Sequence, residues 1–154
     1  MSGKLALAFV LALLLAPAAR AADPPPAAAP AAKIEVVDPY VRLMPPGAPN
    51  TAAFMELRNP TDAEIRLVAA ENGYSKRTEL HTHTMEGGVM KMRQVPFIAV
   101  PARGSVKLAP GGLHIMMLEV PRPLAEGEVV ALTLRFDDGS SAVVKAPARR
   151  PVAR

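Results

Sequence analysis

From Lys33 onward, hydrophobic residues fall in short runs that are separated by glycine, proline, asparagine and aspartate. Many of the runs are rich in β-branched residues, and none keeps a hydrophobic repeat of about 3.6 residues over the length of a helix. Short strands at this spacing predict an all-β fold, arranged as a Greek-key β-sandwich or barrel. The predicted strands cover residues 34–38, 40–44, 51–58, 63–70, 77–85, 89–95, 104–108, 113–120, 129–136 and 140–145.

Two of the connections have the composition of tight hairpins. Glu86-Gly87-Gly88 follows segment 77–85, and Asp137-Asp138-Gly139 follows segment 129–136. Glycine at these positions permits the positive φ angles that two-residue hairpin turns require. Aromatic residues make up 4% of the chain and tryptophan is absent, so we expect a core of valine, leucine, isoleucine, methionine and alanine.

The amino-terminal end has the features of an export signal. Residues 1–21 combine Lys4, a short apolar run and the small-residue sequence Ala19-Arg20-Ala21, which predicts a secretory signal peptide cut after Ala21. A retained anchor is the alternative, although the run is short for a membrane span. Because no cysteine follows the run, a lipid-anchored lipoprotein is not expected. Export would place the protein in the periplasm.

Composition divides the rest of the chain into three parts. Residues 22–32 predict a proline- and alanine-rich linker, residues 33–147 a β-sandwich domain, and residues 148–154 a basic, flexible tail. Without the signal peptide the net charge falls from +4 to +2, and the tail arginines supply what remains. A nucleic-acid partner is not expected, because no basic stripe is interleaved with aromatic residues. Contact of the tail with a membrane surface would be weak.

The chain contains no cysteine. A disulfide, a zinc–thiolate site and a blue-copper site, which needs a cysteine thiolate, are therefore excluded. The nucleophile and metalloprotease motifs G-x-S-x-G and H-E-x-x-H are also absent. The adjacent carboxylates Asp137 and Asp138 are typical of a turn. We therefore expect a protein that is not an enzyme.

Residues 78–120 hold all three histidines and five of the eight methionines. Thioether sulfur is a soft ligand that selects Cu(I), and imidazole suits copper as well, so we interpret this stretch as a copper site. The competing interpretation is that methionine fills gaps in a core. We predict such a packing role for Met55, Met85 and Met117. Met44 could belong either to the core or to the rim of the copper site. The clustered residues are His81, His83, Met85, Met90, Met92, His114, Met116 and Met117.

Strand alternation decides which of these side chains share a face. A turn at Glu86-Gly87 would put His81 opposite Met92, whereas a turn at Gly87-Gly88 would put His83 there instead. Either register makes histidine and methionine cross-strand neighbours, and the sequence leaves both open. A complete site also requires the hairpin to meet the strand that carries His114 and Met116.

Four of these residues have the spacing H-x10-M-x21-H-x-M, which resembles the signature of the PCuAC family, the periplasmic copper chaperones of cytochrome c oxidase assembly. The four residues are His81, Met92, His114 and Met116. The similarity extends over most of residues 34–147. It includes AAFMELRNPTD at 52–62, ELH at 79–81, MEGGVMKMR at 85–93 and VPARGSVKLAPGGLHIM at 100–116.

The resemblance implies a cupredoxin-like β-sandwich that binds Cu(I) through His81, Met92, His114 and Met116. Ligand chemistry also admits Cu(II) as a further form, with additional histidine or water ligands. His83 and Met90 are additional candidate ligands. The resemblance also implies delivery of the copper to the copper centre of cytochrome c oxidase, directly or with another, thiol-based copper chaperone. We expect the protein to act as a monomer. Two alternatives are a metal-independent extracytoplasmic interaction module and a periplasmic copper buffering or resistance protein.

Overall fold

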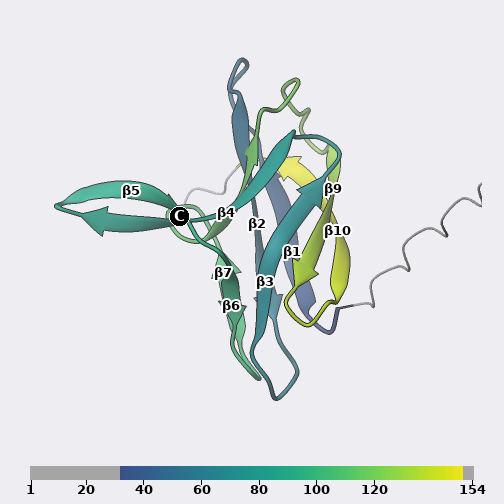
Figure 1. Ribbon diagram of the computed structural model, residues 1–154. Helices are drawn as coiled ribbons and strands as arrows, with labels where there is room; N and C mark the ends of the chain where they lie inside the picture. The colour runs from purple at the N-terminus through teal and green to yellow at the C-terminus, as the bar shows by residue number, and fades with distance from the viewer. Residues whose placement is uncertain (1–31, 151–154) are drawn as a thin grey trace, which may run out of the picture.

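The computed structural model describes residues 32–150, which fold into ten β-strands (Figure 1). They are β1 (Glu35–Arg42), β2 (Asn50–Arg58), β3 (Ile65–Asn72), β4 (Arg77–Glu86), β5 (Val89–Gln94), β6 (Ile98–Val100), β7 (Ser105–Leu108), β8 (His114–Leu118), β9 (Val129–Phe136) and β10 (Ser141–Arg149). This part of the chain has no helix, and hence none long and apolar enough to cross a membrane. The predicted signal peptide, residues 1–21, lies outside the described residues.

The strands form one open path in the order β5-β4-β8-β2-β1-β10-β9-β3-β6, with β7 paired to β2. All pairs are antiparallel except β1 and β10, which run parallel and pair only through Val41–Ala148 and Arg42–Arg149. This short contact joins two antiparallel layers. Because β5 and β6 end the path without pairing to each other, the fold is a sandwich and not a closed barrel.

The hydrophobic core takes side chains from both layers. In β9 the alternation is regular, since Val130, Leu132 and Leu134 are buried while Val129 is exposed. Strand β2 is buried on both of its faces from Thr51 to Met55. The core cluster consists of aliphatic residues, alanine and methionine, with Phe136 as its aromatic member, as the composition predicts.

The three methionines that we predicted as packing residues divide into two groups. Met55 and Met117 are 2% and 0% exposed, which confirms the prediction for both. For Met85 the prediction is wrong, because its exposed fraction is 65%. At this position β4 pairs only with β5, and neither layer of the sandwich covers the side chain.

The strands differ most from the prediction in three places. Segments 34–38 and 40–44 form the single strand β1, whose register shifts between Val37 and Tyr40, where Asp38 has a φ of 49°. The short strand β6 was not predicted, because its three residues follow Pro96 without a clear alternation. Strand β10 continues past residue 147, and Ala148, predicted to begin the flexible tail, is fully buried.

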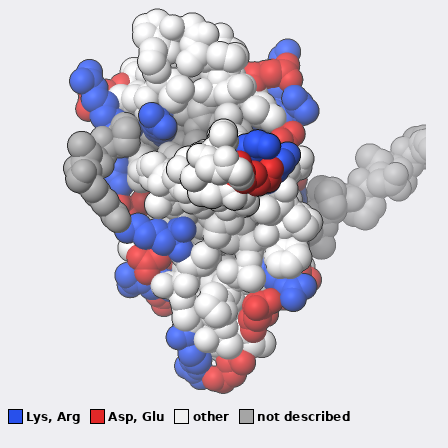
Figure 2. All heavy atoms as spheres, turned by 90° about the vertical axis from the view of Figure 1, so that its left-hand side faces the viewer, with Lys and Arg blue, Asp and Glu red and all other residues white. Residues whose placement is uncertain are grey.

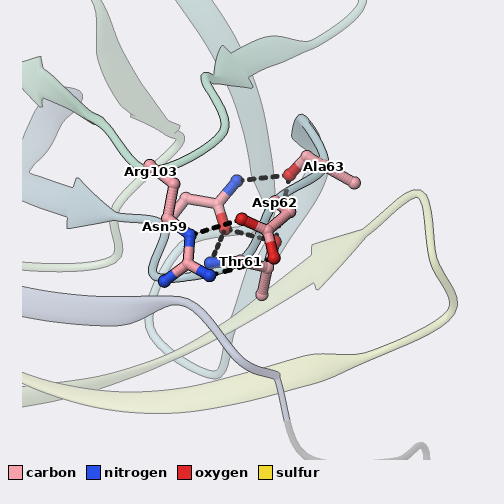
Figure 3. Close-up of polar contacts among 5 residues, drawn as sticks. All are labelled: Asn59, Thr61, Asp62, Ala63 and Arg103. Atoms are coloured by element: carbon pink, nitrogen blue, oxygen red, sulfur yellow. Dashed lines mark hydrogen bonds and ion pairs between the residues drawn. The ribbon is translucent and has the colours of Figure 1, made fainter.

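A buried asparagine organises the turn between β2 and β3 (Figure 3). The Asn59 side chain is 2% exposed, and its amide donates to the carbonyl oxygens of Ala63 (2.7 Å) and Val100 (3.1 Å). Its Oδ1 accepts from the backbone N–H and the hydroxyl of Thr61 at 3.0 and 2.7 Å. Both polar atoms of the buried side chain therefore have their hydrogen bonds, as a stable interior requires.

Candidate metal centre

Strand β4 changes neighbours halfway along its length. Its first half pairs with β8, from Arg77 opposite Leu118 to His81 opposite His114. Its second half pairs only with β5, and this β4–β5 hairpin extends away from the sandwich (Figure 1). His81 and His114 therefore stand at the fork where the hairpin leaves the sheet.

The turn of this hairpin settles the register that the sequence left open. Gly87 and Gly88 form the turn with φ angles of 59° and 77°, values that favour glycine at both positions of a two-residue hairpin turn. His83 therefore lies opposite Met92 and Met85 opposite Met90, whereas Gln94 lies opposite His81. The register that places Met92 directly across from His81 is wrong.

The three histidines gather at the fork. The ring centroid of His114 lies 5.7 Å from that of His81 and 5.2 Å from that of His83. His114 is 2% exposed and also packs against Phe54 of β2, with 6.2 Å between ring centroids. Two separated β-segments thus converge on one cluster of imidazoles, as the copper hypothesis requires.

Hydrogen bonds to oxygen leave the His81 and His114 rings each with one ring nitrogen for another partner. Nδ1 of His114 lies 2.9 Å from the carbonyl oxygen of Gly112, and Nε2 of His81 lies 2.8 Å from Oε2 of Glu79. A carbonyl or ionised carboxylate oxygen only accepts, so these nitrogens donate and the other nitrogen of a neutral ring keeps its lone pair. Metal-binding histidines usually have this arrangement.

The free nitrogen of His81 has no partner within the described residues. His81 Nδ1 is buried and without a hydrogen bond, a condition shared in this part of the chain only by Arg149 Nε. The two atoms differ chemically, because a guanidinium nitrogen carries a proton whereas an imidazole nitrogen can offer a lone pair to a cation. An orphaned lone pair at the fork fits a bound metal ion.

Burial lowers the pKa of His114 below its ordinary value of 6.5. The hydrogen bond that His114 donates to the Gly112 carbonyl raises the pKa, and the neighbouring rings of His83 and His81 lower it further. His114 is therefore neutral at physiological pH. Neutral imidazole is the form that binds a metal.

A pocket of about 200 Å³ opens between the hairpin and the sandwich. Its lining includes the thioethers of Met92 and Met116 together with His83 and His114. Met44, which the sequence left open between core and rim, also lines this pocket. His81 lies beside the pocket without contributing to its lining.

The charged side chains of the hairpin lie on its other face. Glu86 bonds Arg93 at 2.9 and 2.7 Å and lies 3.2 Å from the Lys91 ammonium. These cations hold the pKa of Glu86 at about 2. Figure 2, which faces the tip of the hairpin, shows a largely uncharged projection with basic and acidic atoms gathered at one side. The histidine and methionine face is thus left free of carboxylates from the hairpin itself.

The structure brings five of the six candidate ligands to the fork and its pocket. The sixth, Met90, lies opposite Met85, is 58% exposed and does not line the pocket. Within residues 32–150, no three histidine or carboxylate side chains form a metal-binding group by themselves. Met92 and Met116, which line the pocket with His83 and His114, are the further ligands that this place offers to a metal ion.

Two groups that position the imidazoles were missed from the sequence. Glu79, two residues before His81 and hence on the same strand face, could have been found by alternation. The Gly112 carbonyl could not, because its direction depends on the turn in which Gly112 N–H donates to the Ala109 oxygen.

Comparison with known proteins places the chain in one protein family. The profile described as "Putative lipoprotein LpqE-like" matches residues 34–148. A protein of Leifsonia xyli subsp. xyli (strain CTCB07), "Putative lipoprotein Lxx21020", is 33% identical over 104 residues. The match covers 67% of this chain and 63% of that relative, so the chain matches less than two thirds of the relative's length.

Three solved structures resemble the sandwich. The copper-bound PCuAC domain from PmoF2 superposes with a TM-score of 0.67 at 21% identity, covering 79% of this chain and 96% of that domain. The Cu(I) form of DR1885 from Deinococcus radiodurans gives 0.61 at 35% identity, covering 76% and 80%. Its apo form gives 0.61 at 34% identity, covering 95% and 98%. These likenesses confirm the cupredoxin-like β-sandwich of a PCuAC domain.

The family profile spans most of the described domain, from the residue before β1 to the penultimate residue of β10. The description of the family as lipoproteins contrasts with the absence of cysteine from this chain. The match is nevertheless long enough to decide membership. The chain belongs to the LpqE-like family.

Proposed function

We propose that the protein is a copper chaperone that binds Cu(I) through His81, Met92, His114 and Met116. The observation that carries the proposal is the fork. There, two imidazoles each keep a ring nitrogen free beside a pocket lined by two thioethers. Two imidazole nitrogens and two thioether sulfurs form a neutral, soft ligand set, which suits a monovalent copper ion.

Several features favour transfer of the ion over storage. No thiolate is available to hold copper tightly, since the chain has no cysteine. Met92 is 43% exposed, and all six residues of β5 are exposed, so an acceptor can approach one ligand from solvent. The pocket volume of about 200 Å³ is several times the roughly 30 Å³ of a water molecule, which leaves room for a partner's side chain.

The relatives support copper as the cargo. The Cu(I) form of DR1885, at 35% identity, and the copper-bound PCuAC domain from PmoF2 are both described with copper. By extension we assign Cu(I) to this chain, with Cu(II) as a further form. We assign the periplasm as its location, because a signal peptide is predicted and the family is described as lipoproteins.

We propose the copper centre of cytochrome c oxidase as the acceptor, reached directly by a monomer or through a second, thiol-based copper chaperone. The test is transfer from the Cu(I)-loaded protein to the purified, copper-free soluble domain of the oxidase subunit, followed by separation and metal analysis. Copper should move to the acceptor. Retention of copper by a chaperone that binds it well would instead favour the buffering role.

Binding itself is tested by competition with a chromogenic Cu(I) chelator under anaerobic conditions. The wild-type domain should withdraw one equivalent of copper. A variant carrying Met92→Leu and Met116→Leu should lose at least about 100-fold in affinity, which corresponds to about 2.7 kcal/mol. Met85→Leu is the matched control, because Met85 is an exposed thioether outside the pocket and should leave affinity unchanged.

A further inference from the structure

Two histidines of β4 stand within similar reach of His114. The ring centroids of His81 and His83 lie 5.7 and 5.2 Å from that of His114. His83 is two residues nearer the hairpin tip, which is about 7 Å along a strand, and alternation puts both side chains on the same face. A metal ion beside His114 can therefore be approached by an imidazole from either side.

The surroundings of the two rings differ. His83 lies directly opposite Met92 and lines the pocket with Met92, His114 and Met116. His81 lies opposite Gln94 and outside the pocket lining. In the present structure, His83 is thus the imidazole that shares the pocket with the two thioethers.

The two rings are also held differently. His81 is 13% exposed and its Nε2 is fixed by Glu79, whose carboxylate lies 3.6 Å from the Arg77 guanidinium. Nδ1 of His83 lies 3.4 Å from the Gly112 oxygen, longer than an ordinary hydrogen bond between nitrogen and oxygen. The inner ring is therefore anchored, whereas the outer ring is more loosely oriented.

We propose that His81 and His83 are alternative ligands for one Cu(I) ion, which moves between an outer set containing His83 and an inner set containing His81. His114, Met92 and Met116 belong to both sets. In the exchange, the bond from copper to one imidazole nitrogen breaks as the bond to the other forms. The ion stays Cu(I), and neither ring gains or loses a proton. The inference rests on the proposed Cu(I) binding and adds a route by which the ion reaches the pocket.

A double-mutant cycle on Cu(I) affinity tests the exchange. The full domain is compared with His81→Thr, His83→Thr and the double variant by chelator competition, with Thr82→Ala as the control on the intervening, opposite-facing position. Because either imidazole replaces the other, each single variant should lose less than about 10-fold, and the double variant more than about 100-fold. Thermal unfolding of each copper-free variant shows whether it is folded.

The outcomes separate this inference from the proposed function. A double variant that binds Cu(I) no more weakly than His81→Thr would mean that His83 does not bind the ion. A full loss of affinity in either single variant would mean that only one of the two rings binds it. Both results overturn the exchange, but neither contradicts Cu(I) binding by the wild-type protein. Failure of the wild type to bind Cu(I) overturns both. Long-range proton–nitrogen spectra should show the ring signals of His81 and His83 both shifted by one equivalent of Cu(I), and a shift of only one would also contradict the exchange.

Discussion

The turn at Asn59 and the fork at His81 both bury polar side chains, but they treat them differently. At the turn, the Asn59 amide donates two hydrogen bonds and accepts two, all with partners in the chain itself. Figure 3 shows those with Thr61 and Ala63. At the fork, His81 has one nitrogen bonded to Glu79 and the other buried without a partner. The hydrogen bonds of Asn59 are complete, whereas Nδ1 of His81 is left for a ligand from outside the chain.

This difference separates a structural site from a binding site. A buried polar group with all its hydrogen bonds stabilises one conformation, and removing it leaves its partners unsatisfied. A buried polar atom without a hydrogen bond lowers the stability of the fold unless an external partner supplies the missing interaction. Changes at Asn59 should therefore act on folding alone, and changes at the fork should act mainly on metal binding.

Replacement of the buried amide should give the largest effect on stability. Asn59→Ala should lower the free energy of unfolding by about 3 kcal/mol, because the carbonyls of Ala63 and Val100 lose their donor in a buried place. Urea denaturation measures the change. Asp62→Ala, which removes the exposed partner of Arg103 in the same turn, should cost less than about 1 kcal/mol. A copper affinity that changes in the folded Asn59 variant would contradict the separation.

Removal of the buried imidazole at the fork should act most strongly on copper. His114→Ala should weaken Cu(I) binding by at least about 100-fold, or about 2.7 kcal/mol. It should also lower the free energy of unfolding by about 1–2 kcal/mol, since the ring is buried. Chelator competition and urea denaturation are compared for the same variant. Unchanged copper affinity with a large loss of stability would make the fork a structural site like the turn.

Replacement of an exposed thioether should separate binding from folding most cleanly. Met92→Leu should weaken Cu(I) binding by about 10-fold, or about 1.4 kcal/mol, because leucine has no donor atom. Leucine roughly conserves volume and Met92 is 43% exposed, so the unfolding midpoint should hardly move. A clear loss of stability with unaltered copper affinity would rule out the ligand role of Met92.

The smallest expected effect is on the pH dependence of stability in the copper-free protein. Because burial lowers the pKa of His114, the unfolded chain takes up a proton at pH values where the folded ring stays neutral. Stability should therefore fall as pH drops through about 6.5 and level off below the folded pKa. Urea midpoints between about pH 7.5 and about pH 5.5 should fall more in the wild type than in His114→Gln. Equal pH dependence of the two proteins would exclude this contribution.

The sequence was most informative where the pattern was local. Alternation and turn residues predicted nine of the ten strands at least in part, and the burial of Met55 and Met117. The short strand β6 and the continuation of β10 through Ala148 were missed. Both depend on partners distant in sequence, since β6 pairs with β3 and Ala148 pairs with Val41.

The candidate ligands could be named from the sequence, but their arrangement could not. Spacing singled out His81, Met92, His114 and Met116. In the structure the last three line one pocket, and His81 lies beside it against His114. Which histidine faces Met92 depended on a one-residue choice of turn, and the sequence permits both choices. The exposure of Met85 depended on where β4 leaves the sheet, which no property of the residue itself reveals.

X-ray absorption at the copper edge of the Cu(I)-loaded protein tests the central claim most directly. If the fork holds copper as we propose, the spectrum will contain two nitrogen and two sulfur scatterers, and the sulfur contribution will decrease in Met92→Leu. A first shell of nitrogen and oxygen alone, with no sulfur in the wild type, would contradict the account.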